Sequence, residues 1–266
     1  MPGPNTISPT QLSRLIGTPD APMILDVRLP EDIGLDPRRL PTSRIVAHGD
    51  VTSFLPGIKT QRVVVTCQRG RKLSEGAAAV LRSNGVSAEV LEGGFVAWAA
   101  ADLPLLPQAL MLQTALWVTR HRPKIDRIAC PWLIRRFINP DARFLFVAPA
   151  EVAAVATYFN ATPFDIEEIV YSHRGDGCTF DALLDDFGLH TDALDRLALV
   201  VRAADTDSHD LSPQAAGLLA LSVGLSRQYR DDLQQLEAGM ALYDALYRWA
   251  RDGHDEGHDW PAGRAQ

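Results

Sequence analysis

The stretch VVVTCQRGRKLSEGAAAVL, residues 63–81, decides how the first part of the chain is interpreted. It begins with a β-branched run, which is typical of a buried strand, and ends with an alanine-rich segment that favours a helix. Between them, Cys67 is followed within five positions by three basic residues, Arg69, Arg71 and Lys72. The pattern predicts a strand, a tight loop and a helix, with a thiol at the end of the strand.

We expect the loop after Cys67 to form a cradle for an anion. Gly70 supplies the backbone freedom that a tight wrap requires, and the N–H groups from Gln68 to Lys72 would point at the sulfur with the helix N-terminus behind them. Such groups, and nearby cations, favour a nucleophilic thiolate. Two chemistries use this device: sulfane-sulfur transfer through a cysteine persulfide, and phosphate or arsenate chemistry on a cysteine. The alternative is an inert, buried cysteine.

Strands and helices alternate around this stretch. We expect strands at 22–28, 43–50, 61–67 and 87–94, and helices at 73–85 and 95–104. This alternation predicts an α/β fold in which helices cover both faces of a parallel sheet.

The second part of the chain is predicted to be mostly helical. We expect a first domain at 1–108, a linker at 109–115, a second domain at 116–253 and a flexible tail at 254–266. Helical spacing occurs at 127–138, 149–159, 178–188, 191–205, 212–225 and 229–253, and one strand is expected at 141–149. Pro131 is expected near the start of its helix, where a proline is tolerated.

Composition excludes several classes of protein. The 266 residues fit one large domain or two ordinary ones, and a net charge of −7 argues against general nucleic-acid binding. No apolar run is long enough to span a membrane and no signal peptide is recognisable, so we expect a cytoplasmic protein without a membrane partner. Three cysteines are too few for a disulfide framework and are expected to be thiols.

Residues 1 to about 105 resemble a rhodanese domain. The segment ILDVRLPED (24–32) is similar to the family's first signature, VVVTCQRGRKLS (63–74) to its active-site loop, and EVLEGGFVAWAAADLPL (89–105) to its C-terminal signature. In that family a six-residue loop, as from Cys67 to Lys72, is associated with sulfur substrates, and a longer loop with phosphate. The chain departs from the pattern at Lys72, at Leu73, and at 38–50, where a Gly-His-Ile-Pro-Gly-Ala turn is usual.

The resemblance implies a role for each matching residue. Cys67 would carry the persulfide, and the loop Gln68–Lys72 would supply the N–H ring. Its basic side chains, Arg69, Arg71 and Lys72, would attract an anionic donor such as thiosulfate. A thiol would accept the sulfur, and no cofactor is required. Asp26 and Arg28 match the first signature as candidate substrate-binding residues, with a structural ion pair as the alternative.

Residues 116–253 resemble the C-terminal domain of a chromate-resistance regulator family. The resemblance rests on segments 117–147, 173–189 and 203–225, and is strongest at DRIACPWLIRRF (126–137) and CTFDALL (178–184). In that family the domain follows a DNA-binding half. Because a rhodanese-like domain takes that place here, direct DNA binding is not implied, whereas a link to chromate is.

The second half also contains a candidate metal site. Its residues are Asp126, His173, Asp205 and Asp207, and a histidine with carboxylates suits iron, manganese or zinc. The alternatives are a hydrogen-bonded histidine and a solvated loop at 205–210 in which Asp210 or Ser212 caps the next helix.

The two remaining cysteines lie in this half. We expect Cys130 to face the core, whereas Cys178, just before a helix, is a candidate thiolate.

Two functions are therefore predicted. The first is a cytoplasmic thiosulfate sulfurtransferase that acts through a Cys67 persulfide in the response to chromate or other oxyanions. The second is a non-catalytic chromate- or metal-binding sensor, in which the rhodanese-like domain is an interaction or redox module.

Overall fold

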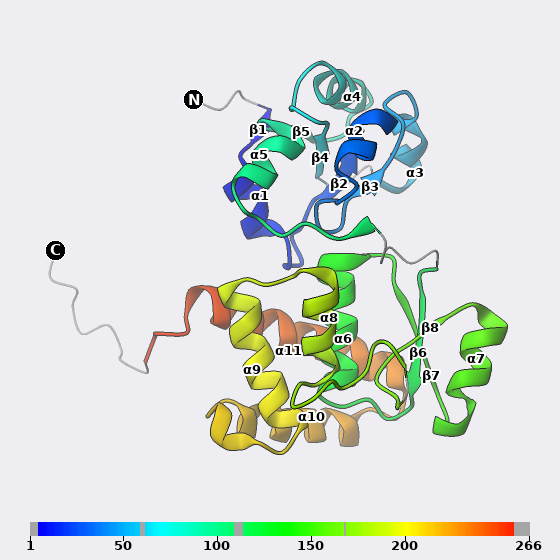
Figure 1. The fold of residues 1–266 in the computed structure, drawn as a ribbon, viewed down its shortest axis with the longest axis vertical. Coiled ribbons are helices and arrows are strands. Elements are labelled where there is room, and N and C mark those ends of the chain that lie inside the picture. Colours follow the sequence, from blue (N-terminus) through cyan, green and yellow to red (C-terminus); the bar gives the residue numbers. More distant parts are fainter. Residues whose placement is uncertain (1–4, 59–61, 109–113, 168, 258–266) are drawn as a thin grey trace, which may run out of the picture.

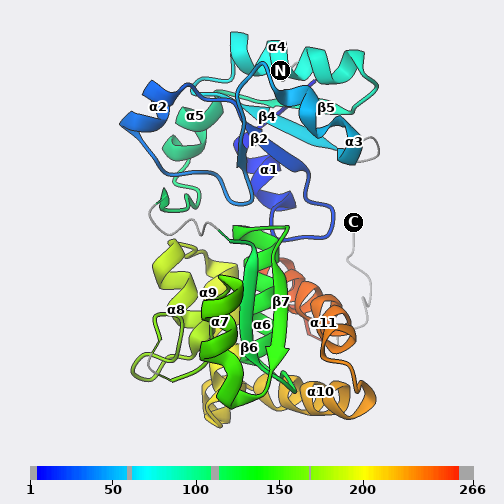
Figure 2. The same ribbon diagram turned by 90° about the vertical axis from the view of Figure 1, so that its right-hand side faces the viewer.

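The computed structural model describes residues 5–58, 62–108, 114–167 and 169–257. Figures 1 and 2 show two bodies stacked along the long axis, with the N-terminal half above the C-terminal half. Among the described residues, no helix combines the length and the apolar character that crossing a membrane requires.

The N-terminal half is built on a five-stranded parallel sheet with strand order β1-β5-β4-β2-β3. Its strands are β1 (Thr6–Ile7), β2 (Met23–Asp26), β3 (Arg44–Ile45), β4 (Val63–Thr66) and β5 (Ala88–Leu91). Its helices are α1 (Pro9–Leu15), α2 (Pro30–Leu35), α3 (Leu55–Ile58), α4 (Lys72–Ser83) and α5 (Gly94–Ala100), with a 3-10 turn at Val51–Phe54. The predicted α/β class is confirmed.

Alternation along β4 explains why helices cover both faces of this sheet. Val63 and Val65 belong to a cluster that contains the α4 residues Ala77, Ala78 and Leu81. Successive side chains on a strand point to opposite faces, and Val64 accordingly belongs to the other cluster, with residues of α1 and α5. Figure 2 shows α4 on the outer side of the sheet and α1 on the side toward the C-terminal half.

Several N-terminal elements were not predicted: β1, the helices α1, α2 and α3, and the 3-10 turn at Val51–Phe54. β1 has only two residues, too few to show a period, and pairs with β5 at the sheet edge. α1 follows a capping box in which the Ser8 hydroxyl accepts from the Gln11 N–H and the Gln11 side chain accepts from the Ser8 N–H. This Ser-Pro-Thr-Gln pattern is visible in the sequence and marks the helix start.

The C-terminal half is mostly helical, as predicted, but it also contains a three-stranded parallel sheet with strand order β7-β6-β8. The strands are β6 (Leu116–Arg120), β7 (Arg143–Val147) and β8 (Thr162–Pro163). The helices are α6 (Asp126–Leu133), α7 (Val152–Phe159), α8 (Thr179–Phe187), α9 (Asp192–Asp205), α10 (Ala215–Gln228) and α11 (Asp232–Asp252). Only β7 was predicted among the strands. β6 was missed because Trp117, Val118 and Thr119 are all buried, so its sequence shows no alternation.

The prediction for Pro131 was wrong. This proline lies inside α6, where it removes a backbone donor, and not in the first turn. The chain continues as a π-helical segment at Ile134–Ile138, so the predicted helix at 127–138 consists of two pieces.

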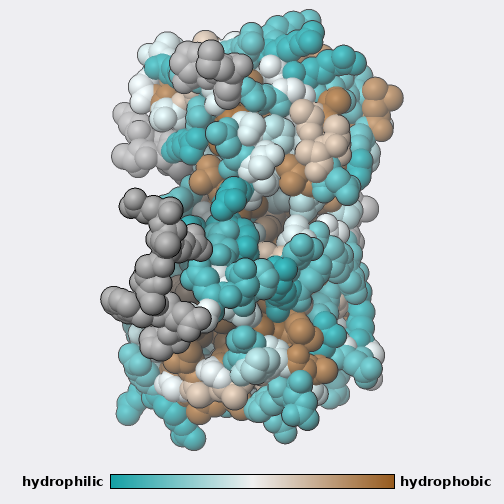
Figure 3. Space-filling view, turned by 90° about the vertical axis from the view of Figure 1, so that its left-hand side faces the viewer, coloured by the Kyte–Doolittle hydropathy of each residue, from teal (hydrophilic) through white to brown (hydrophobic). Residues whose placement is uncertain are grey.

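The two halves share one hydrophobic core. Leu12, Ile16 and Trp98 of the N-terminal half belong to the same buried cluster as Phe137 and Tyr247 of the C-terminal half. A cavity of about 440 Å³ lies at this junction and is lined by residues of α1, α9 and α11 among others. Figure 3 looks onto this side of the molecule, and hydrophilic side chains cover most of it.

The predicted domain boundaries stay a prediction. Most of the predicted linker, 109–113, and most of the predicted tail, 258–266, lie outside the described residues.

Candidate functional sites

Cys67 lies at the carboxyl end of β4, directly before the loop that leads into α4. Its side chain is nearly buried, with 5% of the residue exposed. The Arg71 N–H donates to the Cys67 sulfur at 3.4 Å, and the Ser74 hydroxyl oxygen lies 3.2 Å from that sulfur. The strand, loop and helix predicted from the sequence therefore bring donors to the thiol.

Two glycines let the backbone pack tightly around this loop. Gly70 and Gly94 have φ angles of +61° and +62°, and a Cβ at either position would overlap backbone atoms of the facing segment. The start of α5 can therefore approach closely enough for the Phe95 N–H to donate to the Cys67 carbonyl at 3.0 Å and for the Val96 N–H to donate to the Gln68 carbonyl at 3.1 Å. Gly94 of the segment EGGF, together with Gly70, thus positions the loop.

The surroundings of the Cys67 sulfur favour its thiolate form. Burial raises the pKa of this thiol, but the hydrogen bond with Ser74 and the backbone N–H groups of Arg71, Ser74 and Arg69 lower it by more, so the pKa lies below its ordinary value. The N-terminus of α4 adds a favourable dipole. Ser74 was missed by the sequence analysis, although its position in the first turn of the predicted helix was visible.

The loop's basic side chains face solvent. Arg69, Arg71 and Lys72 are exposed, whereas Gln68 and Gly70 are half-buried. Positive charge at the mouth of a nearly buried thiol attracts an anion from solution.

Asp26 and Arg28 form a buried ion pair, with the Arg28 guanidinium 2.9 Å from the Asp26 carboxylate and neither side chain exposed. Arg28 also donates to the carbonyls of Asp36 and Arg38, and its guanidinium stacks 3.9 Å above the Phe95 ring. The structure therefore favours the structural alternative over substrate binding. The pair holds the segment after α2 against the sheet and α5.

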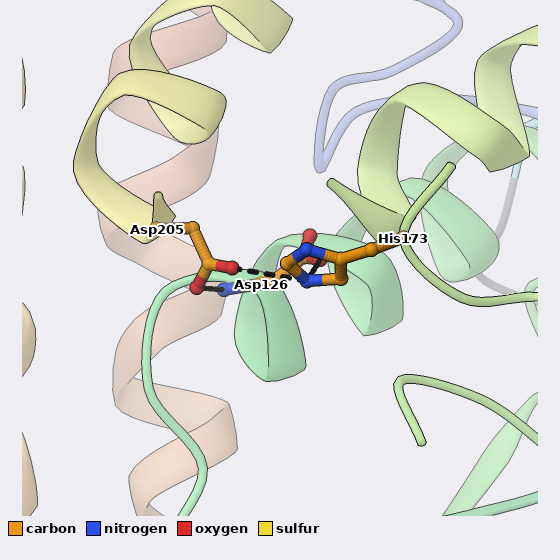
Figure 4. Close-up of side chains that lie close together, drawn as sticks. All are labelled: Asp126, His173 and Asp205. Carbon is orange, nitrogen blue, oxygen red and sulfur yellow. Dashed lines mark hydrogen bonds and ion pairs between the residues drawn. The ribbon is translucent and has the colours of Figure 1, made fainter. Parts of the chain in front are cut away.

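A second cluster of polar side chains lies in the C-terminal half. Asp126 is the first residue of α6, His173 lies in the segment before α8, and Asp205 ends α9. Figure 4 shows the three side chains pointing toward one another, and one ligand atom from each lies within 4.8 Å of the others. The sequence singled out all three, and folding brings them together.

Asp126 is the buried member of this cluster, with 1% of the residue exposed. Its carboxylate accepts from the N–H groups of Thr179 and Phe180 at 2.7 and 3.0 Å, so it also caps the start of α8. The Cys130 thiol donates to the same carboxylate at 3.3 Å. Burial raises the pKa of Asp126, and the carboxylates of Asp205 and Asp165 raise it further.

Asp165 joins the cluster, although the sequence analysis did not identify it. One of its oxygens lies 3.4 Å from Nε2 of His173 and accepts from the Thr179 hydroxyl, while the other pairs with Arg120 and Arg127 at 3.2 Å each. The hydrogen bond with Asp165 and the nearby carboxylates raise the pKa of His173. No local motif marked Asp165, which follows the two-residue strand β8.

Asp207 lies outside the cluster, which corrects the predicted ligand set. Its side chain is 95% exposed and faces His209 at 3.7 Å. The residue follows the end of α9 with a φ angle of +56°. The predicted cap was also wrong, because the N-cap of α10 is Gln214, not Asp210 or Ser212.

The surroundings of the other two cysteines disfavour the thiolate form. Cys130 faces the core, as expected, and Cys178 is equally buried. Burial raises the pKa of both thiols, and the Asp126 carboxylate raises it further. The suggestion that Cys178 is a thiolate is therefore wrong, even though it stands at the start of α8.

Both resemblances seen in the sequence are matched by known families. Residues 117–250 match the family described as ChrB, C-terminal domain, and residues 8–101 match the rhodanese-like domain. Protein ChrB of Cupriavidus metallidurans is 33% identical over 132 residues, which are 49% of this chain and 39% of that protein. The chain therefore spans less than half of this relative's length.

Solved structures with similar folds include rhodanese-like proteins. A rhodanese-related protein of Thermoplasma volcanium is 20% identical, with 38% of this chain and 97% of that chain covered and a TM-score of 0.34. A rhodanese-like domain protein of Staphylococcus aureus is 25% identical, with 35% and 90% covered and a TM-score of 0.31. A thiosulfate sulfurtransferase of Pseudomonas aeruginosa is 25% identical, with 43% and 23% covered and a TM-score of 0.33.

Proposed function

The chain belongs to the family of the ChrB C-terminal domain, and because a rhodanese-like domain precedes that region, we propose that the protein is a sulfurtransferase that serves the response to chromate or related oxyanions. The observation that carries this proposal is the state of Cys67. The Arg71 N–H donates to its sulfur, the Ser74 hydroxyl lies beside that sulfur, and the pKa of the thiol is lowered, while exposed basic side chains stand at the mouth of the loop.

The proposed reaction has two steps. The Cys67 thiolate attacks the outer sulfur of thiosulfate, the bond between the two donor sulfurs breaks, and sulfite leaves with the electron pair. The product is a Cys67 persulfide, whose terminal sulfur carries negative charge and would be held by the same N–H groups as the thiolate. A thiol or cyanide then attacks that terminal sulfur and releases the Cys67 thiolate. No cofactor takes part.

One further feature supports sulfur over phosphate as the transferred group, and another bears on where the reaction takes place. The loop from Cys67 to Lys72 has the length associated with sulfur donors in rhodanese-like domains. The three described cysteines are all free thiols, in keeping with a reducing compartment such as the cytoplasm, where we place the reaction.

The test is a rhodanese assay on the purified full-length chain with thiosulfate and cyanide. We expect the wild type to form thiocyanate and, without cyanide, to gain the mass of one sulfur atom. Cys67→Ser should lose both, because a hydroxyl is not a thiolate at neutral pH. Cys178→Ser, which changes a buried thiol in the other half, is the matched control and should retain both.

The alternative function is a sensor in which the rhodanese-like domain has no catalytic role. It predicts no thiocyanate from any of the three proteins, or the same rate from wild type and Cys67→Ser. Either result would overturn the sulfurtransferase proposal.

A further inference from the structure

The cluster around His173 has no part in the proposed sulfur transfer, because all of its residues lie in the C-terminal half. We propose that Asp126, His173 and Asp205 bind one divalent first-row transition-metal ion, with Asp165 as an additional oxygen ligand beside them. The site would take manganese, iron or zinc as its divalent ion.

The spacing of the polar atoms is the first argument. Nε2 of His173 lies 3.3 Å from Asp205, 3.4 Å from Asp165 and 3.6 Å from Asp126. A single N–H cannot make three well-directed hydrogen bonds, so two of these contacts are unexplained by hydrogen bonding. Around a metal with bonds of about 2.0–2.2 Å, neighbouring ligands of a tetrahedron stand about 3.3–3.6 Å apart, which is the separation that His173 shows.

The second argument is that other groups hold the carboxylates in place. Asp126 is fixed by the N–H groups of Thr179 and Phe180, and Asp165 by the Thr179 hydroxyl. Outer hydrogen bonds of this kind orient the ligands of metal sites and leave lone pairs free for the ion. The ligands therefore need little rearrangement on binding.

The third argument concerns charge. Arg120 and Arg127 both pair with Asp165. Among the interactions of the described residues, Asp126 and Asp205 have His173 as their ion-pair partner. Two carboxylates that share one imidazole carry negative charge that this imidazole does not fully neutralise, and a divalent cation would neutralise it. The nearly buried Asp126 carboxylate would be stabilised most by such a cation.

The exposure of the site shows how an ion can enter, and the types of ligand limit which metal ions it would bind. His173 has 43% of its side chain exposed and Asp205 has 20%, so an ion can enter from the side of the imidazole. One nitrogen with two or three carboxylate oxygens suits manganese, iron or zinc, whereas calcium requires six to eight oxygen ligands and copper(I) prefers sulfur.

The test uses the full-length chain after treatment with a chelator. Zn²⁺ and Mn²⁺ are titrated separately by calorimetry, and bound metal is counted by elemental analysis after desalting. We expect one equivalent of at least one of the two ions per chain. His173→Gln and Asp205→Asn should each weaken binding at least about tenfold, since each removes a ligand.

His190→Gln is the matched control. His190 also contacts two carboxylates, Asp185 at 3.0 Å and Asp195 at 2.9 Å, but all three side chains are half exposed or more. This variant should bind metal as the wild type does. Circular dichroism of the metal-free proteins verifies that each variant is folded.

Two results would overturn the proposal: less than stoichiometric binding of both ions by the wild type, or unchanged affinity in His173→Gln. In either case the cluster is an ion-pair network in which, among the described residues, the protonated His173 side chain is the only cation that the carboxylates of Asp126 and Asp205 share. Cys67 chemistry is measured separately on the same samples, so either proposal can fail alone.

Discussion

Cys67 differs from the other two cysteines in what surrounds each sulfur. Backbone N–H groups and a hydroxyl face Cys67 and lower the pKa of its thiol. Carboxylates lie near Cys130 and Cys178, and together with burial they raise the pKa of those thiols. Burial raises the pKa of all three thiols, and only at Cys67 do hydrogen-bond donors outweigh it, so the groups around the sulfur distinguish Cys67 as the candidate reactive thiol.

Ser74→Ala should shift the reactivity of Cys67 to higher pH. Removing the hydroxyl takes away one interaction that lowers the pKa of the thiol, so the thiolate forms only at higher pH. The pH dependence of alkylation by iodoacetamide measures this directly. Ser83→Ala, an exposed serine at the end of the same helix, should leave the profile unchanged. Coincident profiles for wild type and Ser74→Ala would contradict the assigned role.

At the scale of elements, the loop between β4 and α4 depends on the segment that leads into α5. The carbonyls of Cys67 and Gln68 accept from N–H groups of Phe95 and Val96, which requires the two backbones to approach closely. Gly94 permits this approach. The candidate active site therefore depends on the consecutive elements β4 and α4 and also on α5, which follows them only after β5.

Gly94→Ala should destabilise the protein and impair the Cys67 loop. The residue has a φ angle of +62°, and its Cβ would overlap the Cys67 carbonyl, so we expect a loss of about 1–3 kcal/mol. Gly76→Ala is the control, since Gly76 is exposed in α4 and a Cβ there meets no atom within 4 Å. It should stabilise α4 by up to about 1 kcal/mol. Urea denaturation compares the two, and equal stabilities would refute the packing argument.

At the scale of the whole molecule, the two halves pack as one core. Trp98 of α5 and Phe137 after α6 belong to the same buried cluster, and Arg44 pairs with Asp141 across the junction at 2.7 Å. Neither the Cys67 loop nor the His173 cluster lines the cavity at this junction. The two candidate sites therefore do not open into this cavity.

Gly17→Ala should loosen the junction between the halves. Its φ angle is +83°, and a Cβ there would overlap the rings of Phe137 and Tyr247 in the other half. Gly85→Ala is the control, because Gly85 has a φ angle of +81° but no atom within 4 Å of a Cβ. The control should lose about 1–2 kcal/mol for its backbone conformation. Gly17→Ala should lose about 1–3 kcal/mol more for overpacking. Thermal unfolding measures both, and equal losses would rule out contact across the junction.

Local signals in the sequence are sufficient to predict several of the elements. The β-branched run before Cys67 forms β4, and the alanine-rich segment forms α4, close to the predicted bounds. The predicted strand at 87–94 is shorter in the structure, because β5 ends at Leu91 and α5 already begins at Gly94. Asp126, His173 and Asp205 could also be singled out, because a histidine and aspartates at loop or helix ends suggest metal chemistry.

Which of these groups lie in contact depends on the tertiary structure. In the folded chain, Asp207 is exposed to solvent, Asp165 after β8 contacts His173, and the Ser74 hydroxyl lies beside the Cys67 sulfur. The structure also contains β6, whose three central residues are all buried, so that its sequence shows no period. The reason is physical: pattern and propensity act over a few residues, whereas these contacts depend on strand pairing and on the burial of side chains far apart in the chain.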